Sequence, residues 1–388
     1  MDALMYNAKQ AEQQHLLQVY AQYDFEPVAA DGVTLTCRDG STLLDLYGGH
    51  AVAALGYAHP ELLQALAAQA QALMFQSNAV ALEVRATAAS KLAAFGPPGL
   101  ERVFFCNSGA EANENALRIA LRHTGRRKVL AIEHGFHGRT AAAGAVTWGA
   151  DNWYGFPQKP FDVEFIPRDD AAAAARLIDA ETAAVILEPV QGIAGAYALD
   201  PGFVATIAQA CGMHGALLIA DEVQSGMGRC GVPFAIQLYD VTPDILTTAK
   251  ALGAGFPCAA VMLTPATARA LGSGDLGTTF GGGPLACAMI NTVLDVIARD
   301  QLIDNVQRIS TRIRAECVTG PVTDVCGRGF LLGLRCSGGA APVRAQLLRQ
   351  GILTGSSSDP EVIRLLPPLT LGDAHVDQLK HALQHIAV

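Results

Sequence analysis

The sequence has little charge, few aromatic residues and no long hydrophobic run. Charged residues make up 16% of the 388 positions, aromatic residues make up 6%, and the net charge is −9. Because there is no basic excess, the sequence lacks the positive field that attracts nucleic acids and anionic membrane surfaces. No apolar stretch reaches the roughly 20 residues that a membrane-spanning helix needs. We therefore expect neither a nucleic-acid nor a membrane partner.

Targeting segments and cysteine motifs are also missing. Residues 1–15 are polar and glutamine-rich, without the apolar core of a signal peptide or the arginine-rich pattern of a transit peptide. The nine cysteines are an odd number and none forms a Cys-x-x-Cys pair. Free thiols in a reducing compartment are therefore expected, which predicts a cytoplasmic protein. His134 and His137 lack an accompanying carboxylate–histidine set at ligand spacing, so no metal site is expected.

Apolar residues make up 51% of the sequence, which at this length predicts a large domain plus a smaller one. Between about residues 100 and 265, alanine-rich helical stretches alternate with short apolar runs. These runs are Val103–Cys106, Val129–Glu133, Ala183–Glu188, Ala216–Asp221, Ile245–Thr248 and Ala259–Leu263. Their apolar residues are continuous, as in strands buried on both faces of a parallel sheet. The predicted fold class is α/β.

Two other segments predict helices. Ala171–Ala175 is typical of a helical run on the surface. The glycines of Gly281–Gly283 precede a helical pattern from Leu285 to about Asp300, which predicts a crossover into a C-terminal domain.

Polar side chains follow several of the predicted strands at their carboxyl ends. They include Asn107 with Ser108, then Glu188, Asp221 and Lys250. In open α/β sheets ligands bind beyond the carboxyl ends of the strands. We therefore expect these residues to meet in one crevice.

Ser108 and Glu111 stand three residues apart at the start of a helical pattern, as in a capping box. Taken alone, this pattern is more often only a helix cap. Here Gly109 lets the backbone approach a ligand, and the free amides at a helix start favour an anion. The segment predicts a phosphate site.

Asp221 and Lys250 are the candidate catalytic groups. A buried aspartate needs a cationic or hydrogen-bonding partner, and a protonated pyridine nitrogen supplies both, although a structural salt bridge is the simpler alternative. Lys250 is the only charged residue of the stretch Leu246–Gly253. A lysine among apolar groups binds its proton less tightly, which suits it to imine formation.

Two glycine-framed loops supply further candidates. In Gly135–Thr140, Phe136 can cover a flat cofactor and Arg139 can bind a carboxylate through its bidentate fork. In Gly277–Gly282, two threonine hydroxyls suit a phosphate, although an ordinary glycine-rich turn is the alternative.

Together these motifs resemble the class III pyridoxal-phosphate aminotransferases, and within them the acetylornithine aminotransferases. The resemblance covers nearly the whole chain, from Leu43–Val52 and Gly56–Pro60 to Val362–Thr370. It implies a fold type I transferase with pyridoxal 5′-phosphate bound as a Schiff base to Lys250. It also implies a homodimer with shared active sites. The expected parts are a large cofactor-binding domain at residues 45–285 and a small α+β domain at residues 286–388, on which residues 1–44 pack.

The resemblance also implies a role for each candidate residue. Ser108, Gly109 and Ala110 are expected to hold the cofactor phosphate, and Asp221 is expected to pair with the ring nitrogen. Phe136 and Val223 are expected to lie on the two faces of the cofactor ring, and Gln224 is expected to reach its phenolic oxygen. Thr279 is expected to contact the phosphate bound in the neighbouring subunit. Arg139, with Thr278 beside it, is expected to bind the α-carboxylate of the substrate.

Glu188 and Arg364 resemble a pair that switches between the two substrates. Paired, they would admit the amino donor; separated, they would leave Arg364 free for a carboxylate of glutamate or 2-oxoglutarate. A permanent structural ion pair is the alternative. The chain departs from the family pattern at Ile193-Ala194 and at Gly283, and these departures leave the identity of the substrate open.

The expected reaction is transfer of the terminal amine of N-acetylornithine, or of a similar acylated ornithine, to 2-oxoglutarate in arginine biosynthesis. Alternative donors are free ornithine, succinylornithine, a lysine-pathway intermediate, 4-aminobutyrate and a diamine. Tyr20 or Tyr23 would meet the α-amino end of the donor. An alternative of another class, a nucleotide-binding oxidoreductase, rests only on Gly253-Ala254-Gly255.

Overall fold

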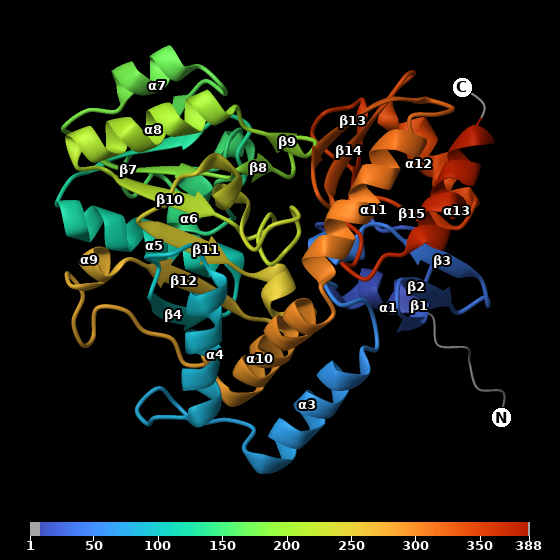
Figure 1. The fold of residues 1–388 in the computed structure, drawn as a ribbon, viewed down its shortest axis with the longest axis horizontal. Helices are drawn as coiled ribbons and strands as arrows, with labels where there is room; N and C mark the ends of the chain where they lie inside the picture. Colours follow the sequence, from blue (N-terminus) through green and yellow to red (C-terminus); the bar gives the residue numbers. More distant parts are fainter. Residues whose placement is uncertain (1–7, 387–388) are drawn as a thin grey trace.

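The computed structural model describes residues 8–386, and Figure 1 shows a larger and a smaller part side by side. Residues 1–7 of the expected N-terminal segment lie outside the described residues. The boundaries expected at residues 44 and 285 stay predictions.

A seven-stranded sheet forms the centre of the larger part (Figure 1). In spatial order its strands are β4 (Arg102–Cys106), β12 (Ala259–Leu263), β11 (Ile245–Thr248), β10 (Leu217–Asp221), β7 (Thr182–Leu187), β5 (Lys128–Ile132) and β6 (Asp162–Ile166). All neighbours are parallel except β12, which is antiparallel to β11 and β4. Every predicted apolar run is a strand of this sheet, which confirms the α/β class and the mostly parallel sheet.

Helices cover both faces of this sheet, because successive side chains of a buried strand point to opposite faces. Leu218 and Ala220 of β10 belong to the same core cluster as residues of α8 (Pro201–His214), and Ile219 belongs to the cluster under α5 (Gly109–Thr124). Other helices of the larger part are α4 (Glu83–Phe95), α6 (Ala141–Ala145), α7 (Ala171–Leu177) and α9 (Pro265–Ala268).

The alanine run predicted as a surface helix is helical, but its placement on the surface is wrong in part. Ala173 and Ala174 are buried because α7 packs against α8. Alanine shows no contrast between the two faces of a helix, so its run does not reveal which face is covered.

The smaller part contains two sheets built from both ends of the chain. One has the order β1 (Pro27–Asp31), β2 (Thr34–Cys37), β3 (Thr42–Asp45) and β15 (Ile352–Leu353); the other has β13 (Val322–Arg328), β14 (Leu331–Cys336) and β16 (Val362–Leu365). In the first sheet Leu44 pairs with Ile352, so the N-terminal strands join the C-terminal part directly. The helices of this part are α11 (Leu302–Glu316), α12 (Ala340–Arg349) and α13 (Asp373–Gln384).

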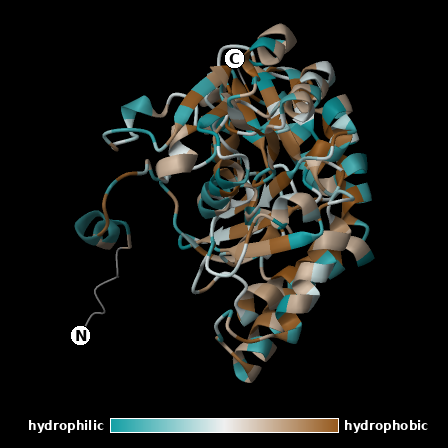
Figure 2. Ribbon diagram, turned by 90° about the vertical axis from the view of Figure 1, so that its left-hand side faces the viewer, coloured by the Kyte–Doolittle hydropathy of each residue, from teal (hydrophilic) through white to brown (hydrophobic). Residues whose placement is uncertain are grey.

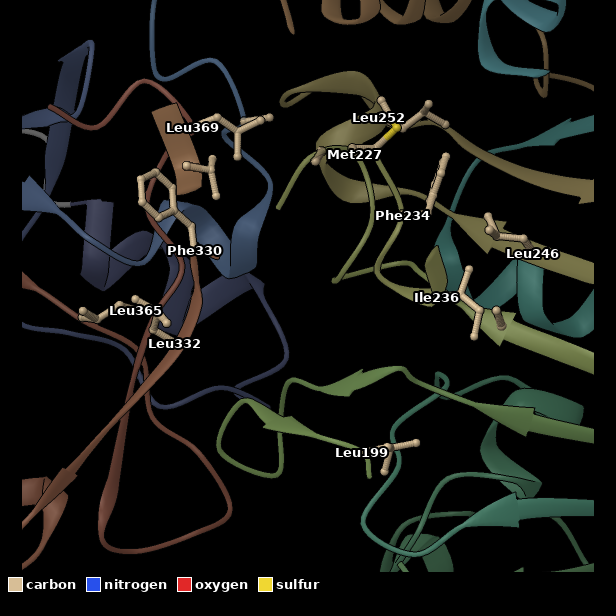
Figure 3. Packing of buried hydrophobic residues seen from close by; sticks show 14 of the residues in the cluster. Leu199, Met227, Phe234, Ile236, Leu246, Leu252, Phe330, Leu332, Leu365 and Leu369 are labelled. Carbon is tan, nitrogen blue, oxygen red and sulfur yellow. The ribbon is translucent and has the colours of Figure 1, made fainter. Parts of the chain in front are cut away.

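α10 (Pro284–Arg299) connects the two parts, as the pattern from Leu285 predicts, and it packs against α3 (Pro60–Ala72) and α4. One hydrophobic cluster extends across both parts. Figure 3 shows Met227, Phe234 and Leu252 beside the central sheet, with Phe330 and Leu332 on the side of the smaller part.

Figure 2 shows hydrophobic residues concentrated inside the body and hydrophilic residues on the outer helices. The short helix α1 (Ala8–His15) stands apart from the body and has no buried residue.

Within residues 8–386 no helix combines the length and apolar character that crossing a bilayer requires. All nine cysteines lie in this range as free thiols.

Candidate active site

A cavity of about 690 Å³ lies where several strands of the central sheet end. Its lining includes the candidates Ser108, Gly109, Ala110, Phe136, Arg139, Glu188, Asp221, Val223, Gln224 and Lys250. The candidates outside the lining are Thr278, Thr279 and Arg364. The structure therefore brings most of the predicted residues together in one site, in agreement with the topological argument.

The N-terminus of α5 forms one wall of the cavity. Ser108 caps it, with Oγ accepting from the Glu111 amide at 3.1 Å, and the Glu111 carboxylate accepts from the Asn107 amide at 2.8 Å. The amides of Gly109 and Ala110 have no acceptor among residues 8–386. A Cβ on Gly109 would lie 2.6 Å from Val223 Cγ1, so only glycine fits here. This wall is built to receive an anion.

Asp221, at the end of β10, is 3% exposed and lies in a hydrogen-bond network. Its Oδ2 lies 2.7 Å from His137 Nδ1 and accepts from Asn113 Nδ2 at 2.7 Å. Asn113 Oδ1 accepts in turn from Thr247 Oγ1 at 2.7 Å. Oδ1 of Asp221 accepts from the Val223 amide at 3.0 Å. The network fixes the carboxylate and keeps it as an acceptor that faces the cavity.

Lys250 begins the short 3₁₀ turn Lys250–Gly253 that follows β11. Its φ of 45° lies in the left-handed region, which is unfavourable for a residue with a Cβ and is common at functional sites. Burial lowers the pKa of the Lys250 amine, opposed by the negative charges of Asp221 and Glu188 and reinforced by Arg364. The amine therefore loses its proton more readily than a solvated lysine.

Glu188 and Arg364 form no ion pair in the part of the chain that the structure describes. The Glu188 carboxylate accepts from the Phe136 amide at 2.8 Å and from the Gly192 amide at 3.3 Å, and burial raises its pKa to about 7. Arg364 is 4% exposed; it donates from Nε to the Ser356 carbonyl at 2.5 Å and from Nη1 to Gln224 Oε1 at 3.3 Å. Burial lowers the pKa of the Arg364 guanidinium. In this structure Glu188 and Arg364 are therefore separated, each with its own hydrogen-bond partners. The alternative of a permanent ion pair between them is not what the structure has.

Arg139 is an exposed member of the lining, and its guanidinium lies over the Trp153 ring, 4.4 Å from the centroid. Such stacking holds the side chain while leaving its donors available. Among residues 8–386 no carboxylate pairs with Arg139.

The threonines predicted at a phosphate lie away from the cavity. Thr278 Oγ1 accepts from Asn107 Nδ2 at 3.2 Å and from the Gly281 amide at 3.1 Å, so its hydroxyl supports the loop and does not lie beside Arg139 in the lining. Thr279 is exposed.

Sequence reasoning missed several residues of the site. Asn113 follows Gly109 by one helical turn as the polar member of an otherwise apolar buried face, and that contrast is a signal that could have been used. The sequence suggests no role for His137 beyond an unsupported metal site, whereas its ring lies against Asp221. His50 also lines the cavity. Of the two tyrosines expected near the α-amino end of the donor, Tyr20 lines the cavity and Tyr23 does not.

The stretch Gly253-Ala254-Gly255 does not support a nucleotide-binding site. It lies in the turn after Lys250, ahead of β12, and it does not open an α-helix. The oxidoreductase alternative is therefore wrong.

Comparison with known proteins gives the same picture. The family "Aminotransferase class-III" matches residues 19–387. An acetylornithine aminotransferase of Methanopyrus kandleri is 38% identical over 98% of both chains, and one of Streptomyces coelicolor is 42% identical over 92% of this chain and 90% of its own.

Solved structures of aminotransferases share the fold of this chain over nearly its whole length. An ornithine aminotransferase of Toxoplasma gondii has a TM-score of 0.91 at 29% identity and covers 99% of this chain and 96% of its own. An acetylornithine aminotransferase of Elizabethkingia anophelis has a TM-score of 0.85 at 29% identity and covers 97% of both chains. Another structure of the T. gondii enzyme has pyridoxal phosphate at its active site with partial occupancy. The chain therefore belongs to the class III aminotransferases, has the fold type I architecture, and uses pyridoxal 5′-phosphate as its cofactor.

Proposed function

We propose that the protein transfers the terminal amino group of N-acetylornithine, or of a similar acylated ornithine, to 2-oxoglutarate. The products are the corresponding semialdehyde and glutamate, and the reaction would serve arginine biosynthesis. The observation that best supports a donor with a carboxylate is Arg139, a stacked arginine in the same cavity as Lys250 that has no acidic partner among residues 8–386. The relatives named acetylornithine aminotransferase, 38% and 42% identical, support the same donor.

The residues of the cavity fit the cofactor. The free amides of Gly109 and Ala110 and the dipole of α5 suit a phosphate. Asp221, an acceptor fixed by its network, suits a protonated ring nitrogen. Phe136 and Val223 line the cavity and would lie against the two faces of the ring, and Gln224 would reach its phenolic oxygen. Lys250 would hold the cofactor covalently.

Bound pyridoxal phosphate would supply a ring that accepts the electrons of a breaking carbon–hydrogen bond. Asp221 keeps the proton on the ring nitrogen, since a fixed carboxylate favours the cationic form. Once the donor amine has replaced it on the cofactor, the Lys250 amine, whose pKa burial lowers, would take a proton from the carbon that bears the donor amine and would deliver it to the cofactor carbon to which that amine is joined.

Arg139 orients the donor through its α-carboxylate. When 2-oxoglutarate binds, Arg364 would take its second carboxylate, because its present contacts are neutral oxygens of Ser356 and Gln224. Glu188 would pair with Arg364 when the donor occupies the site. This switch is part of the proposal.

We further propose a homodimer with shared active sites. An exposed apolar patch, defined here as Met74, Phe75, Val80 and Phe280, lies beside Thr279. The rings of Phe75 and Phe280 are 5.5 Å apart at their centroids. Exposed apolar side chains that lie near one another are typical of an interface. Thr279 would then reach the phosphate bound in the partner subunit.

The free thiols of the nine cysteines support a reducing compartment, and we propose the cytoplasm.

We also propose that residues 45–285 form the large domain and residues 286–388, with residues 1–44, form the small one. Limited proteolysis tests this division through the positions of the first cuts.

The central experiment has two parts. Purified protein supplied with pyridoxal phosphate should show a visible absorption band that borohydride abolishes, and the reduced cofactor should be found on the peptide that contains Lys250. Lys250→Ala should lose both signals and the activity. If the wild type binds no pyridoxal phosphate, the assignment of this cavity fails.

The donor is tested with a panel of N-acetylornithine, N-succinylornithine, ornithine, 4-aminobutyrate and a diamine, each with 2-oxoglutarate. The highest kcat/KM is expected for an acylated ornithine. Arg139→Ala should raise KM for carboxylate-bearing donors about 10- to 100-fold, since a charged hydrogen-bonded contact is lost. Arg168→Ala is the matched control, because Arg168 also stacks on a ring, Tyr197, but lies outside the lining. A clear preference for free ornithine would overturn the proposed donor.

A second candidate donor is a different acylated amine. An aminotransferase of Yersinia pestis that is 39% identical is named for both acetylornithine and succinyldiaminopimelate. Ile193, one of the departures from the family pattern, lines the cavity and offers an apolar contact that suits more than one acyl group. Adding N-succinyldiaminopimelate to the panel tests this candidate.

A further inference from the structure

The segment that follows β3 turns through a left-handed backbone. Four consecutive residues, Gly48 to Ala51, have φ angles of 56°, 56°, 66° and 69°. Left-handed geometry is unfavourable for residues with a Cβ, so His50 and Ala51 adopt it only because the surroundings enforce it. Strain of this kind is concentrated at functional sites. This strain makes the turn a candidate functional element.

Contacts on several sides hold the turn in this shape. Asp45 Oδ1 accepts from the amides of Tyr47 at 2.8 Å and of Gly48 at 2.9 Å. The His50 carbonyl accepts from Gln224 Nε2 at 3.3 Å. A Cβ on Gly48 would lie 2.6 Å from the Leu366 carbonyl oxygen, so no larger residue fits there.

The side chain placed by this turn is His50, which lines the cavity. The Tyr47 hydroxyl contacts the His50 ring at both nitrogens, at 2.9 Å from Nε2, and the two ring centroids are 4.7 Å apart. The Tyr47 ring is itself fixed, since a Cβ on Gly355 would lie 2.6 Å from it. Tyr47 is thus a positioning residue for the His50 ring.

His50 belongs to the outer part of the cavity. Asp221 and Glu188 are buried and Lys250 is half-buried, whereas Arg139 and His50 are exposed members of the lining. A donor whose terminal amine reacts at Lys250 extends its other end outward. That end bears the α-carboxylate, which Arg139 would take, and the α-nitrogen.

The charges around this outer end disfavour an ammonium group. The acids of the lining are Asp221 and Glu188, and their oxygens already accept protein hydrogen bonds. Partial desolvation of the ring and the positive charges of Arg364 and Lys250 lower the pKa of His50, which favours the neutral ring near pH 7. Among residues 8–386, a free α-ammonium would meet cations in the lining without an available carboxylate. A neutral amide would find a hydrogen-bonding partner in a nitrogen of the ring, because the Tyr47 hydroxyl can bond to only one of the two nitrogens at a time.

We propose that His50, positioned by Tyr47, recognises the neutral acylamide of the donor and discriminates acylated donors from those with a free α-ammonium. This inference rests on the proposed function, and it assigns donor selection to a residue that takes no part in the chemistry.

Calorimetry with two unreactive ligands tests the proposal. N-acetylnorvaline has the chain, carboxylate and amide of N-acetylornithine but no terminal amine, and pentanoate has the chain and carboxylate alone. His50→Asn is the first variant, because asparagine tolerates the left-handed backbone and is too short to replace the ring. Tyr47→Phe is the second, because it keeps the ring against Gly355 and removes only the hydroxyl. In both variants N-acetylnorvaline should bind about three- to tenfold more weakly, while the Kd of pentanoate stays unchanged.

The outcomes separate this inference from the proposed function. If the wild type prefers N-acetylornithine and both variants bind N-acetylnorvaline like the wild type, only the role of His50 is overturned. Equal weakening of both ligands also overturns it, since His50 would then be structural. If the wild type prefers free ornithine in the donor panel, the proposed function and this inference fail together. Should His50→Asn not fold, Tyr47→Phe decides.

Discussion

Asp221 owes its fixed orientation to the buried residues Asn113 and His137, which hold its carboxylate. Asn113 joins three partners: Nδ2 donates to Asp221 Oδ2 and to the His137 carbonyl, both at 2.7 Å, and Oδ1 accepts from Thr247 Oγ1. All of these groups are buried. In a low-dielectric interior such a network is strong when complete and costly when one member is missing.

Asn113→Ala should therefore destabilise the protein and weaken cofactor binding. The substitution removes a partner from Asp221, Thr247 and the His137 carbonyl, so we expect the free energy of unfolding to fall by about 1–3 kcal/mol. Urea denaturation of the apoprotein measures it. Asn115→Ala is the control, since Asn115 donates to the Glu111 carbonyl of the same helix. Equal losses in the two variants would contradict a special role for Asn113.

Burial of Glu188 makes the free energy of unfolding depend on pH. Burial raises its folded-state pKa to about 7 from an ordinary value of 4.5. The folded protein thus retains a proton that the unfolded chain has lost, so this residue reduces stability as pH rises from about 4.5 through 7.

In Glu188→Gln this loss of stability should be absent. The difference in free energy of unfolding, wild type minus variant, should fall by about 1–3 kcal/mol between pH 5 and pH 8. Urea denaturation of both apoproteins at the two pH values measures it. Any fixed cost of placing an NH₂ group near the Phe136 or Gly192 amide is independent of pH and cancels. A difference that rises with pH would show that Glu188 is ionised in the folded protein throughout.

The sequence shows only part of this network. Lys250, Asp221 and Gly109 each stand in a local pattern, namely an uncharged stretch, a strand end and a helix start. Asn113 and His137 meet Asp221 from positions 108 and 84 residues away, and no local pattern reveals such a pairing. The outer part of the site depends in the same way on a turn around His50 whose shape is set by distant partners such as Gln224.

At the scale of elements, α5 combines a predictable start with a position that only packing explains. Ser108, Glu111 and the left-handed C-cap Gly125 follow the rules for helix ends. Gly109 does not, because alanine would favour the helix by about 1 kcal/mol. Glycine stands there because Val223 occupies the space of a Cβ.

Gly109→Ala should therefore lower the affinity for pyridoxal phosphate despite its better helix propensity. The Cβ would push Val223 or the helix start out of place, so we expect about a tenfold or larger rise in Kd by fluorescence titration. Gly212→Ala is the matched control: this glycine lies in α8 with nothing within 4 Å of a built Cβ. It should leave the Kd unchanged and stabilise the protein by about 0.5–1 kcal/mol. Unchanged cofactor affinity in Gly109→Ala would contradict the phosphate assignment.

The sequence predicts some strands of the central sheet and misses others, because only some are buried on both faces. Continuous apolar runs identify the strands at the middle of the sheet because these are buried on both faces. β6, at the edge, alternates between exposed and half-buried residues and was not predicted. The antiparallel direction of β12 also escaped prediction, since an apolar run has no direction. The short strands of the smaller part depend on pairing between the two ends of the chain.

For the whole molecule, contacts between the two parts hold the loop that follows β10. Arg229 is fully buried; its Nη1 donates to the Pro367 carbonyl, and its own carbonyl accepts from the Phe330 amide at 2.8 Å. The loop begins with the cavity residues Val223 and Gln224. Movement of the smaller part would therefore change the cavity, which is consistent with a site that must accept two substrates in turn.

Two loops form the apolar patch beside Thr279. Asn78 Nδ2 donates to the carbonyls of Thr278 and Gly281, so the loop that bears Phe75 and the loop that bears Phe280 are held together as one surface. Phe280 is 66% exposed, and burying such a ring in a second subunit is favourable. If Thr279 serves the phosphate of the partner subunit, then dimerisation and cofactor affinity are coupled.

Phe280→Asp should therefore shift the protein from dimer to monomer in light scattering and raise the Kd for pyridoxal phosphate at the same time. Met213→Asp is the matched control, because Met213 is 68% exposed on α8, on a different element of the chain. Thr279→Ala should raise the same Kd while leaving the dimer intact, since the hydroxyl and not the apolar patch is removed. A monomeric wild type with full cofactor affinity would contradict both the interface and the shared site.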